Sequence, residues 1–454
     1  MNYQLVLDQQ HLYFNHHQTR SYEFRLDALK RLKEAILTYE EEIKEALKKD
    51  LNKSEFESFL TEIGITIIEI NETIKNLRRW MKPKKVKTPI TLFHAKSYIY
   101  QEPYGTVFIM SPWNYPFQLA ISPLIGVIAA GNTAMIKTSQ DSPETSKVIK
   151  KMLNEIYPSE FVSVFTGDLE ESKALLKLKY DYIFFTGSTV VGKIVMGEAS
   201  KNLIPVTLEL GGKSPAIIDE TVDLDLTAKR IAYGKFINAG QTCIAPDYVL
   251  IKEELKDEYL KQTKKHIESW FGDDPLSHPD YPKIINEKNH QRLLSLIENE
   301  TVLLGGGFSK DKIEPTMLNH ITKDSKVMHE EIFGPILPLI TYKNETDLIE
   351  EIKWFEKPLA LYLFTKNKSL EKRIIDELSF GGATINDTLM HFGNKNIPFG
   401  GVGASGMGSY HGYKSFETFS HAKGVVKRST TIDLDFRYPP YTKRKLGLLK
   451  KFIK

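Results

Sequence analysis

The 454 residues of this chain include a single cysteine, Cys243. One cysteine cannot form an intrachain disulfide, which excludes the disulfide-stapled class of secreted folds and favours a reducing, cytoplasmic location. Neither charge sign dominates, because 61 Lys and Arg residues oppose 58 Asp and Glu residues and leave a net charge of +3. Dedicated nucleic-acid-binding proteins carry a strong basic excess, so we expect no nucleic-acid partner.

Long uninterrupted hydrophobic runs are also missing. The most apolar stretch, residues 107–130, has about the length of a membrane span, but three prolines, Asn114 and Gln118 interrupt it. We interpret it as a buried strand followed by a buried helix. The first residues lack the basic cluster and apolar core of a signal peptide, so none is expected.

Common metal and phosphate motifs are absent or misplaced. The 12 histidines and one cysteine form no cluster with metal-ligand spacing, so no metal is expected. The stretch Gly401–Gly406 matches G-x-G-x-x-G, but a dinucleotide fingerprint requires a strand directly before it and a helix directly after it. Neither element is predicted there, and we interpret the stretch as a tight loop.

What the sequence does contain is an alternation of strands and helices. Five short apolar strands, separated by helices, are predicted at 105–110, 134–137, 162–165, 182–185 and 206–210. This pattern indicates βαβ units and a parallel sheet. A second alternating stretch begins near Ser214, which places a domain boundary near Gly211-Gly212. Upstream, the spacing of apolar residues predicts two helices, at 27–50 and 55–81.

The last 12 residues, 443–454, contain six basic residues and no acidic one. One interpretation is a solvated tail. The other is a short basic amphipathic segment that contacts an anionic membrane surface. The segment is too short and too charged to span a bilayer, so the second interpretation predicts only a weak peripheral contact.

Cys243 and Glu209 are the candidates for catalysis. Cys243 follows small and polar residues, which suits an open loop or helix start where backbone N–H groups stabilise a thiolate. Glu209 lies near the end of an apolar strand beside two glycines, where a general base with a raised pKa is one interpretation. The alternatives are a small buried hydrophobe for Cys243, and an edge carboxylate or buried ion-pair member for Glu209.

Two further positions suit a phosphate-bearing ligand. Gly187 and Ser188 lie between a predicted strand and a predicted helix, where Gly187 allows close backbone approach and Ser188 either donates to a phosphate or only caps the helix. Lys137 ends another strand, and ligands of open parallel sheets bind at the carboxyl ends of strands. A snorkelling surface lysine is the alternative for Lys137.

Six motifs in a fixed order carry a resemblance to a known family. They are residues 112–116 (PWNYP), 185–188 (FTGS), 208–215 (LELGGKSP), 240–243 (GQTC), 331–335 (EIFGP) and 398–401 (PFGG). With them, the chain resembles the aldehyde dehydrogenases from about residue 20 to 441. The late runs 406–412 and 437–441 are similar to those of class 3 members. Several long motifs in the same order argue against a chance match.

The resemblance implies a role for each matched residue. Cys243 matches the nucleophile that attacks the aldehyde, and Asn114 matches the amide that holds the oxyanion together with the backbone N–H of Cys243. Glu209 matches the base that activates water to hydrolyse the thioester left after hydride transfer. The implied contacts with NAD are made by Trp113, Lys137, Gln140, Gly187, Ser188, Gly192, Leu210, Glu331 and Phe333.

The chain departs from the class 3 pattern at Gln140. After the cofactor lysine, class 3 members commonly carry Pro-Ser-Glu, whereas this chain has Thr138-Ser139-Gln140. A carboxylate there accepts hydrogen bonds from the ribose and repels a 2′-phosphate. Neutral Gln140 removes that repulsion, so we expect NAD as cofactor, with better tolerance of NADP than in a Glu-bearing relative.

The fold implied by the resemblance is α/β, with a parallel-sheet cofactor-binding domain, an α/β catalytic domain and a small β oligomerisation arm. The expected segments are 1–84 and 102–211 for the cofactor-binding domain, 212–420 for the catalytic domain, 85–101 and 421–440 for the arm, and 441–454 for the basic tail. The arm is expected to mediate a homodimer, and the active site to lie in the crevice between the two large domains.

The implied activity is oxidation of medium- or long-chain aliphatic or aromatic aldehydes to carboxylic acids. An apolar substrate tunnel is predicted, with ordinary core packing as the alternative, from Tyr115, Tyr233, Phe236, Ile244, Ile385, Met390 and Phe392. Three other functions stay open, of which thiol esterase action would be a side activity of the same Cys243. The second is transfer of the acyl group to coenzyme A, against which Glu209 argues because a thiol needs no water-activating base. The third is a non-catalytic binding or structural role on the same fold.

Overall fold

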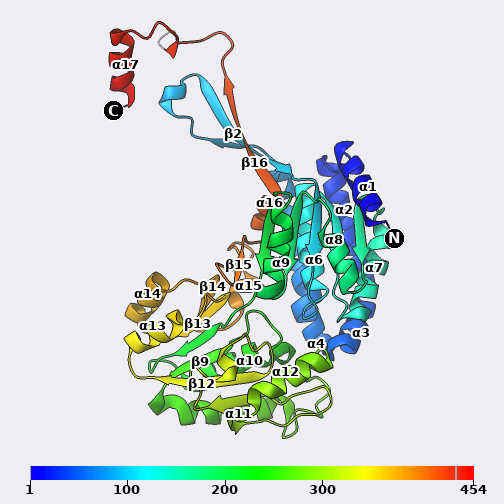
Figure 1. The fold of residues 1–454 in the computed structure, drawn as a ribbon, viewed down its shortest axis with the longest axis vertical. Coiled ribbons are helices and arrows are strands. Elements are labelled where there is room, and N and C mark those ends of the chain that lie inside the picture. The colour runs from blue at the N-terminus through cyan, green and yellow to red at the C-terminus, as the bar shows by residue number, and fades with distance from the viewer. Residues whose placement is uncertain (1, 435–436, 454) are drawn as a thin grey trace.

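The computed structural model describes residues 2–434 and 437–453, which form two large α/β bodies and a projecting arm (Figure 1). Each body is a sheet with its packed helices, and the two are called the first and the second layer below. Residue 1 of the predicted cofactor-binding domain, residues 435 and 436 of the predicted arm and residue 454 of the tail lie outside the described residues. Within the described part of the chain, no helix combines the length and the apolar character needed to cross a membrane.

A six-stranded sheet forms the centre of the first layer. In spatial order its strands are β15 (Gly406–Met407), β7 (Val206–Glu209), β6 (Tyr182–Thr186), β3 (Thr106–Met110), β4 (Thr133–Lys137) and β5 (Val162–Phe165). The five longer strands are parallel, as the alternating pattern predicts, and the short β15 runs antiparallel to β7. Each predicted strand of this sheet is therefore present.

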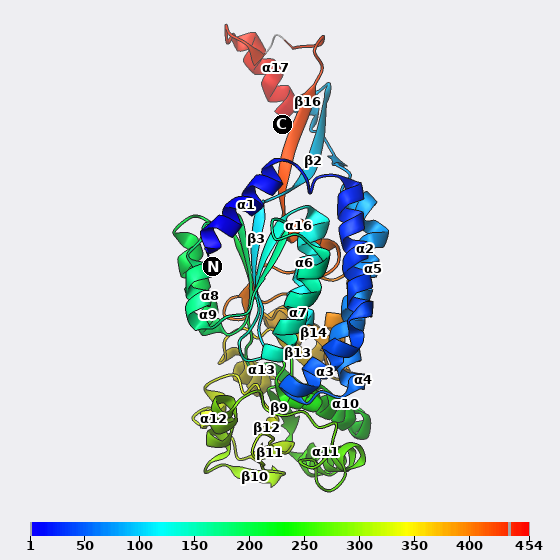
Figure 2. The same cartoon turned by 90° about the vertical axis from the view of Figure 1, so that its right-hand side faces the viewer.

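Helices cover both faces of this sheet, because successive strand residues point to opposite sides. Val107 and Ile109 belong to a core that includes α2 (Tyr22–Thr38), α3 (Glu40–Leu51), α5 (Gly64–Trp80), α6 (Gln118–Ala130) and α7 (Pro143–Ile156). Phe108 between them belongs to a second core, which includes α1 (Tyr3–Asn15), α8 (Leu169–Leu176) and α9 (Thr189–Ser200). Figure 2 shows the sheet between these two groups of helices.

The N-terminal helices differ from the sequence expectation. The helix predicted at 27–50 is two helices, α2 and α3, which break at Tyr39. The helix predicted at 55–81 contains a π-helical turn, η1 (Phe59–Ile63), between α4 (Glu55–Ser58) and α5. Helix α1 was not predicted. Its buried Gln10 donates from Nε2 to the carbonyls of Ala134 and Ser159, at 2.9 and 3.0 Å, and so docks α1 on the sheet.

A seven-stranded sheet forms the centre of the second layer. Its strands, in spatial order, are β10 (Thr301–Leu304), β11 (Thr316–Asn319), β12 (Ile336–Tyr342), β9 (Tyr248–Lys252), β8 (Pro215–Ile218), β13 (Ala360–Phe364) and β14 (Gly382–Ile385). All neighbours are parallel except the pair of β10 and β11. The chain enters this layer between β7 and β8, where the sequence places the domain boundary.

Among the described residues, the second layer contains five longer helices and four short helical turns. The longer helices are α10 (Leu224–Phe236), α11 (Lys256–Phe271), α12 (Glu287–Ile297), α13 (Glu345–Lys353) and α14 (Lys368–Glu377). The short turns are η3 (Ile237–Gly240), η4 (Glu253–Leu255), η5 (Lys326–Met328) and α15 (Met390–Gly393).

Near its end the chain returns to the first layer. Strand β15 pairs with β7, and α16 (Tyr413–Thr418) packs on α6. The segment 212–420, expected to form one catalytic domain, therefore contributes to both layers, because β15 covers the edge of β7. The stretch Gly401–Gly406 is a loop that leads into β15, as predicted. A Cβ at Gly401 would lie 2.0 Å from the Ser405 carbonyl oxygen, so the close approach requires glycine.

A three-stranded antiparallel sheet projects from the first layer (Figure 1). Its order is β1 (Lys84–Val86), β2 (Ala95–Pro103) and β16 (Ser420–Arg428), with the short turn η2 (Ile90–Leu92) between β1 and β2. The arm is thus built from two parts of the chain that are far apart in sequence. Helix α17 (Lys443–Ile453) lies beyond it.

Candidate active site

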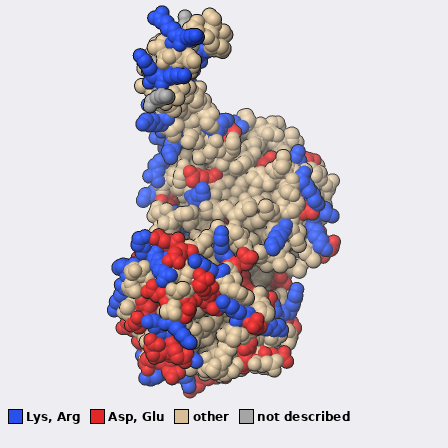
Figure 3. Space-filling model, turned by 60° about the vertical axis from the view of Figure 1, so that its left-hand side comes forward, with Lys and Arg blue, Asp and Glu red and all other residues tan. Residues whose placement is uncertain are grey.

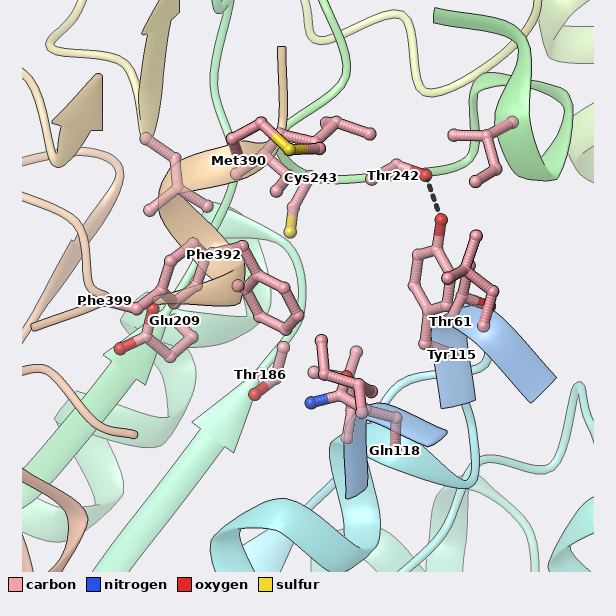
Figure 4. A pocket seen from close by; sticks show the side chains of 18 of the residues that line it. Thr61, Tyr115, Gln118, Thr186, Glu209, Thr242, Cys243, Met390, Phe392 and Phe399 are labelled. Atoms are coloured by element: carbon pink, nitrogen blue, oxygen red, sulfur yellow. Dashed lines mark hydrogen bonds between the residues drawn. The ribbon is translucent and has the colours of Figure 1, made fainter. Parts of the chain in front are cut away.

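Cys243 lies where two cavities meet. It follows η3 in the turn that leads to β9, and it is half-buried. An apolar cavity of about 260 Å³ extends toward α10, and a more polar cavity of about 400 Å³ extends toward the start of α9. Leu119, Thr186, Glu209 and Cys243 line both cavities. Figure 4 shows the sulfur of Cys243 pointing into the apolar cavity.

Three successive left-handed residues shape the loop before Cys243. Asn238, Ala239 and Gly240 have φ angles of 51°, 50° and 72°, a conformation that costs of order 1–3 kcal/mol for a residue other than glycine. Gly240 also lies against Gly334, since a Cβ at Gly240 would be 2.2 Å from the Gly334 carbonyl oxygen. The small residues of this loop therefore allow a close approach that larger ones would prevent.

Hydrogen bonds hold this strained loop against Asn114. The backbone N–H of Asn238 donates to Oε1 of Glu57 at 2.9 Å, and Nδ2 of Asn238 donates to the carbonyl of Asn114 at 2.9 Å. In return, Nδ2 of Asn114 donates to the carbonyl of Gln241 at 3.0 Å. A side-chain amide has two N–H groups, so one N–H of Asn114 stays available to a ligand.

A buried ion pair supports Asn114 from the other side. Nζ of Lys53 lies 2.6 Å from Oε1 of Glu62 and donates to the carbonyl of Asn114 at 3.0 Å. Oε2 of Glu62 accepts the backbone N–H groups of Phe117 and Gln118 at 2.9 and 3.1 Å, at the start of α6. Both charged side chains are fully buried. The π-helical turn η1, which contains Glu62, is thus tied to the segment that carries Asn114.

Burial dominates the electrostatics of Cys243. Removal from water raises the pKa of its thiol, and the carboxyl groups of Glu331 and Glu209 raise it further. The backbone N–H groups of Cys243 and Ile244 lower the pKa, as the sequence suggests, but their effect is smaller. The thiol is therefore protonated at neutral pH.

Glu209 lies at the end of β7 with only 2% of its surface exposed. Neither of its carboxyl oxygens has a hydrogen-bond partner among the described residues. Burial raises its pKa well above the ordinary value. Burial thus favours the uncharged acid form of Glu209, and once ionised it is a stronger base than an exposed carboxylate.

The apolar cavity contains most of the residues predicted for a tunnel. Tyr115, Tyr233, Ile244, Met390 and Phe392 line it, and the hydroxyl groups of Tyr115 and Thr242 are hydrogen-bonded at 2.6 Å (Figure 4). Two of the predicted residues do not line this cavity. Phe236 packs with Ile267, and the partly buried Ile385 of β14 packs against the core of the second layer.

The polar cavity contains most of the predicted cofactor contacts. Its lining includes Trp113, Asn114, Gly187, Ser188, Leu210, Glu331 and Phe333. The rings of Trp113 and Phe333 meet edge to face, with centroids 5.4 Å apart. Burial raises the pKa of Glu331 to about 8. Ser188 caps α9, since its Oγ accepts the backbone N–H of Val191.

Three predicted cofactor residues do not line this cavity. Lys137 is buried at the end of β4, where its Nζ donates to the Thr138 carbonyl at 2.6 Å, and burial lowers its pKa. Gln140 is exposed in the loop that follows. Gly192 lies inside α9 against Leu210, and a Cβ there would be 2.7 Å from a Leu210 methyl group.

Comparison with known proteins identifies the family. Residues 7–425 match the model of the aldehyde dehydrogenase family. The chain belongs to this family. Its α/β fold is the fold of the aldehyde dehydrogenases, as the resemblance implies.

Close relatives of this aldehyde dehydrogenase support a class 3 assignment. The 4,4'-diaponeurosporen-aldehyde dehydrogenase of Staphylococcus aureus is 50% identical over 446 residues, 97% of each chain. Aldehyde dehydrogenase family 3 member A2 of Pongo abelii is 44% identical over 445 residues, 96% of this chain and 92% of that one. A substrate-bound structure of Staphylococcus aureus AldH matches with a TM-score of 0.98 and 48% identity over the whole of both chains.

This aldehyde dehydrogenase is an NAD(P)-dependent oxidoreductase that converts aldehydes to carboxylic acids. Within residues 2–434 and 437–453, no group of three or more His, Cys, Asp and Glu side chains is arranged to hold a metal ion.

Sequence reasoning missed several residues of the site. Thr186 lines both cavities, and Asn289 and Arg292 of α12 line the polar one. Arg292 donates from Nη2 to the Ile332 carbonyl at 2.6 Å and from Nη1 to Oε1 of Glu330 at 3.0 Å. It thereby fixes the segment that carries Glu331. Helix α12 is exposed and polar on its other face, so nothing in its local pattern distinguishes Arg292.

We predict that Lys53→Met lowers the free energy of unfolding by about 3–5 kcal/mol, because it leaves Glu62 buried without its partner. Urea unfolding followed by circular dichroism measures this. The double substitution Lys53→Met with Glu62→Gln should lower the free energy of unfolding by less than the sum of the two single substitutions. As a control, Lys151→Met removes an exposed pair with Glu42 and should have little effect. Equal effects at both positions would contradict the prediction.

Proposed function

We propose that this enzyme oxidises apolar aldehydes at the junction of its two cavities, with Cys243 as nucleophile and Glu209 as general base. The observation that carries the proposal is that both residues line both cavities. An aldehyde in the apolar cavity and a nicotinamide in the polar one can then approach the same sulfur atom from two sides.

In the first step, the thiolate of Cys243 attacks the carbonyl carbon, and a C–S bond forms as the carbonyl oxygen becomes an alkoxide. The free N–H of the Asn114 amide and the backbone N–H of Cys243 stabilise this charge. Two N–H donors directed at a developing oxyanion stabilise its charge more strongly in a buried site than in water. Because burial raises the pKa of the thiol, its proton must pass to solvent water before attack, and attack becomes faster as pH rises.

The polar cavity suits the pyrophosphate and nicotinamide parts of NAD(P). Thr189 and Val190 of the first turn of α9 line it, and the free N–H groups of a helix N-terminus bind phosphate. Gly211 leaves room for Glu331, because a Cβ there would lie 2.0 Å from Oε2 of Glu331. A nicotinamide held by these residues would supply the acceptor for the hydride that leaves the carbon attached to Cys243.

Each predicted cofactor residue has a place in this proposal. Gly187 and Ser188 would hold the pyrophosphate, and Lys137 would reach a ribose hydroxyl after its Nζ leaves the Thr138 carbonyl. The residues that would hold the nicotinamide end are Trp113, Leu210, Glu331 and Phe333. Gly192 would act indirectly, by letting Leu210 pack close to α9.

In the last step, Glu209 takes a proton from a water molecule, and the resulting hydroxide attacks the thioester carbon. The C–S bond breaks, the carboxylic acid leaves, and Cys243 is restored. The burial that raises the pKa of Glu209 also makes its ionised form a stronger base. The fraction of Glu209 in this active form increases as pH rises.

We predict that Glu209→Gln still releases a burst of NAD(P)H, because acylation of Cys243 does not need the base, but then turns over about 100-fold or more slowly. Stopped-flow absorbance of NAD(P)H with an apolar aldehyde measures both phases. The wild-type steady-state rate should rise with pH above neutrality, and this rise should be lost in Glu209→Gln. Cys243→Ala should show neither burst nor turnover. A Glu209→Gln enzyme with wild-type turnover would exclude Glu209 as the base.

The apolar lining supports aldehydes with aliphatic or aromatic chains as substrates. Tyr233, Ile244 and Phe392 present hydrocarbon surface, and the hydroxyl of Tyr115 is already bonded to Thr242. Burial of apolar surface therefore supplies most of the binding energy, at about 25 cal/mol per Å². The Staphylococcus aureus relative is named for 4,4'-diaponeurosporen-aldehyde, which favours the long-chain end of this range.

Gln140 supports tolerance of NADP beside NAD. The residue is exposed, follows Lys137 by three positions and carries no charge. A ribose held near Lys137 brings its 2′ position close to this loop. A neutral amide there would leave a 2′-phosphate unrepelled.

We predict that Gln140→Glu lowers kcat/KM for NADP by about fivefold relative to NAD, equivalent to ~1 kcal/mol of repulsion between exposed like charges. Parallel kcat/KM measurements with the two cofactors test this. Gln140→Ala serves as the control, because it removes the amide without adding charge. A wild-type enzyme that already rejects NADP strongly would contradict the proposal.

The projecting end of the molecule supports two kinds of contact. In the arm, β16 is an edge strand with free backbone groups, so a second copy of the chain can pair with it and form a homodimer.

In α17, the exposed Leu446, Leu449 and Ile453 recur at steps of three and four and share one face. Lys and Arg side chains gather on this end of the molecule (Figure 3), which favours weak contact with an anionic membrane.

We predict that truncation after Tyr441 abolishes binding to vesicles that contain phosphatidylserine, while the full chain binds them and ignores pure phosphatidylcholine vesicles. Vesicle sedimentation at low and high salt measures this, since the basic contribution should weaken with salt. Both proteins should sediment as dimers, because the truncation leaves the arm intact. Equal vesicle binding by the two proteins would contradict the membrane contact, and a monomeric full chain would contradict the dimer.

A further inference from the structure

A third cavity, of about 370 Å³, adjoins the apolar cavity at Cys243. Leu60, Tyr233 and Ile237 line both cavities, so the two cavities lie next to each other at these three side chains, called the neck below. The third cavity lies between α4, the end of α10 and the end of α11. None of the roles described above uses it.

The lining of the third cavity is largely aromatic. Its rings come from Phe56, Phe236, Trp270 and Phe271. Phe56 is 77% exposed, and Leu60 and Tyr233 at the neck are 45% and 39% exposed. Single exposed apolar residues are ordinary, but apolar residues gathered around one cavity are typical of a binding surface.

The polar groups of this cavity exclude a strongly charged ligand. No basic side chain is among the described residues that line it, which argues against an anion. Oε1 of Glu57 already accepts the backbone N–H of Asn238, at 2.9 Å. Burial raises the pKa of Glu57 to about 7, so this carboxyl attracts a cation only weakly. Asp280 is exposed to solvent. An apolar chain fits the remaining surface.

We propose that the third cavity is a distal subsite that binds the far end of a long apolar aldehyde, whose chain passes the neck at Leu60, Tyr233 and Ile237 while its carbonyl group lies at Cys243. The proposal rests on the proposed function, because it assigns the head of the substrate to the apolar cavity. It narrows the substrate class to apolar aldehydes whose chains are too long for the first cavity alone. Its basis is the adjacency of the two cavities at three shared side chains, of which Leu60 and Tyr233 are substantially exposed and can let a chain pass.

Binding in the distal subsite predicts a particular dependence on chain length. Each methylene that leaves water should raise kcat/KM by about fourfold until the third cavity is filled. Aldehydes whose chains end before the neck do not reach the aromatic rings of the third cavity, so those rings add nothing to their kcat/KM. The ratio of kcat/KM for hexadecanal to that for hexanal therefore reports on the subsite.

The kinetic experiment compares this ratio in wild type, Phe56→Asp and Phe308→Asp. Phe56 is highly exposed, so an aspartate there leaves the core intact while placing a charge at the subsite. Phe308 is also an exposed phenylalanine but lines none of the three cavities, and it is the matched control. We expect the ratio to fall at least about tenfold in Phe56→Asp, as when several methylenes stay in water, and to be unchanged in Phe308→Asp. An unchanged ratio in Phe56→Asp overturns the proposal.

A binding experiment separates the subsite from catalysis. In Cys243→Ala, 16-bromohexadecanol should quench tryptophan fluorescence, because its terminal bromine reaches Trp270, whereas 6-bromohexanol should not. The quenching should disappear when Trp270→Phe is added. Quenching that persists without Trp270, or no quenching by the long alcohol, overturns the subsite whatever the activity. If the quenching is found but wild-type enzyme forms no NAD(P)H with any aldehyde, the proposed function fails and the subsite stands.

Discussion

The buried pair of Lys53 and Glu62 joins three parts of the chain that are distant in sequence. Lys53 follows α3, Glu62 lies in the π-helical turn before α5, and together they bind the backbone from Asn114 to the start of α6. Two charges without water are tolerable only when each is paired and hydrogen-bonded. The pair therefore requires all three segments to be in place at once. Since Asn238 bonds to the same carbonyl of Asn114, the loop before Cys243 depends on this arrangement as well.

Desolvation sets the chemistry at the junction of the cavities. The same burial raises the pKa values of Cys243, Glu209 and Glu331, and so favours the uncharged form of each group. Groups in their uncharged form lose less hydration than ions do when an apolar aldehyde binds beside them. Deprotonation becomes the costly event, and it is confined to the steps in which a nucleophile or a base is needed.

Much of this site could be predicted from the sequence, but not all of it. Cys243, Glu209 and Asn114 stand in long motifs whose order identifies the family, and they converge at one place. Near the end of a helix or strand, residue spacing could not tell which side chains line the cavity at Cys243 and which do not. Tyr233 and Phe236 are one turn apart on α10, yet Tyr233 lines the apolar cavity while Phe236 packs with Ile267. That distinction depends on α11, which the local pattern of α10 does not contain.

The two large layers are linked by more than one passage of the chain. It crosses between β7 and β8, returns before β15, and the backbone N–H of Lys283 bonds to the Leu51 carbonyl between the layers at 3.0 Å. Two crossings and a direct hydrogen bond restrict relative movement of the two bodies more than a single crossing would. We therefore expect reactants to enter and leave through rotamer changes at the cavity mouths, for example at the exposed Met390, on the nanosecond scale of side-chain motion. In such an enzyme, the reacting groups keep their relative positions between turnovers, because no domain movement has to bring them together again.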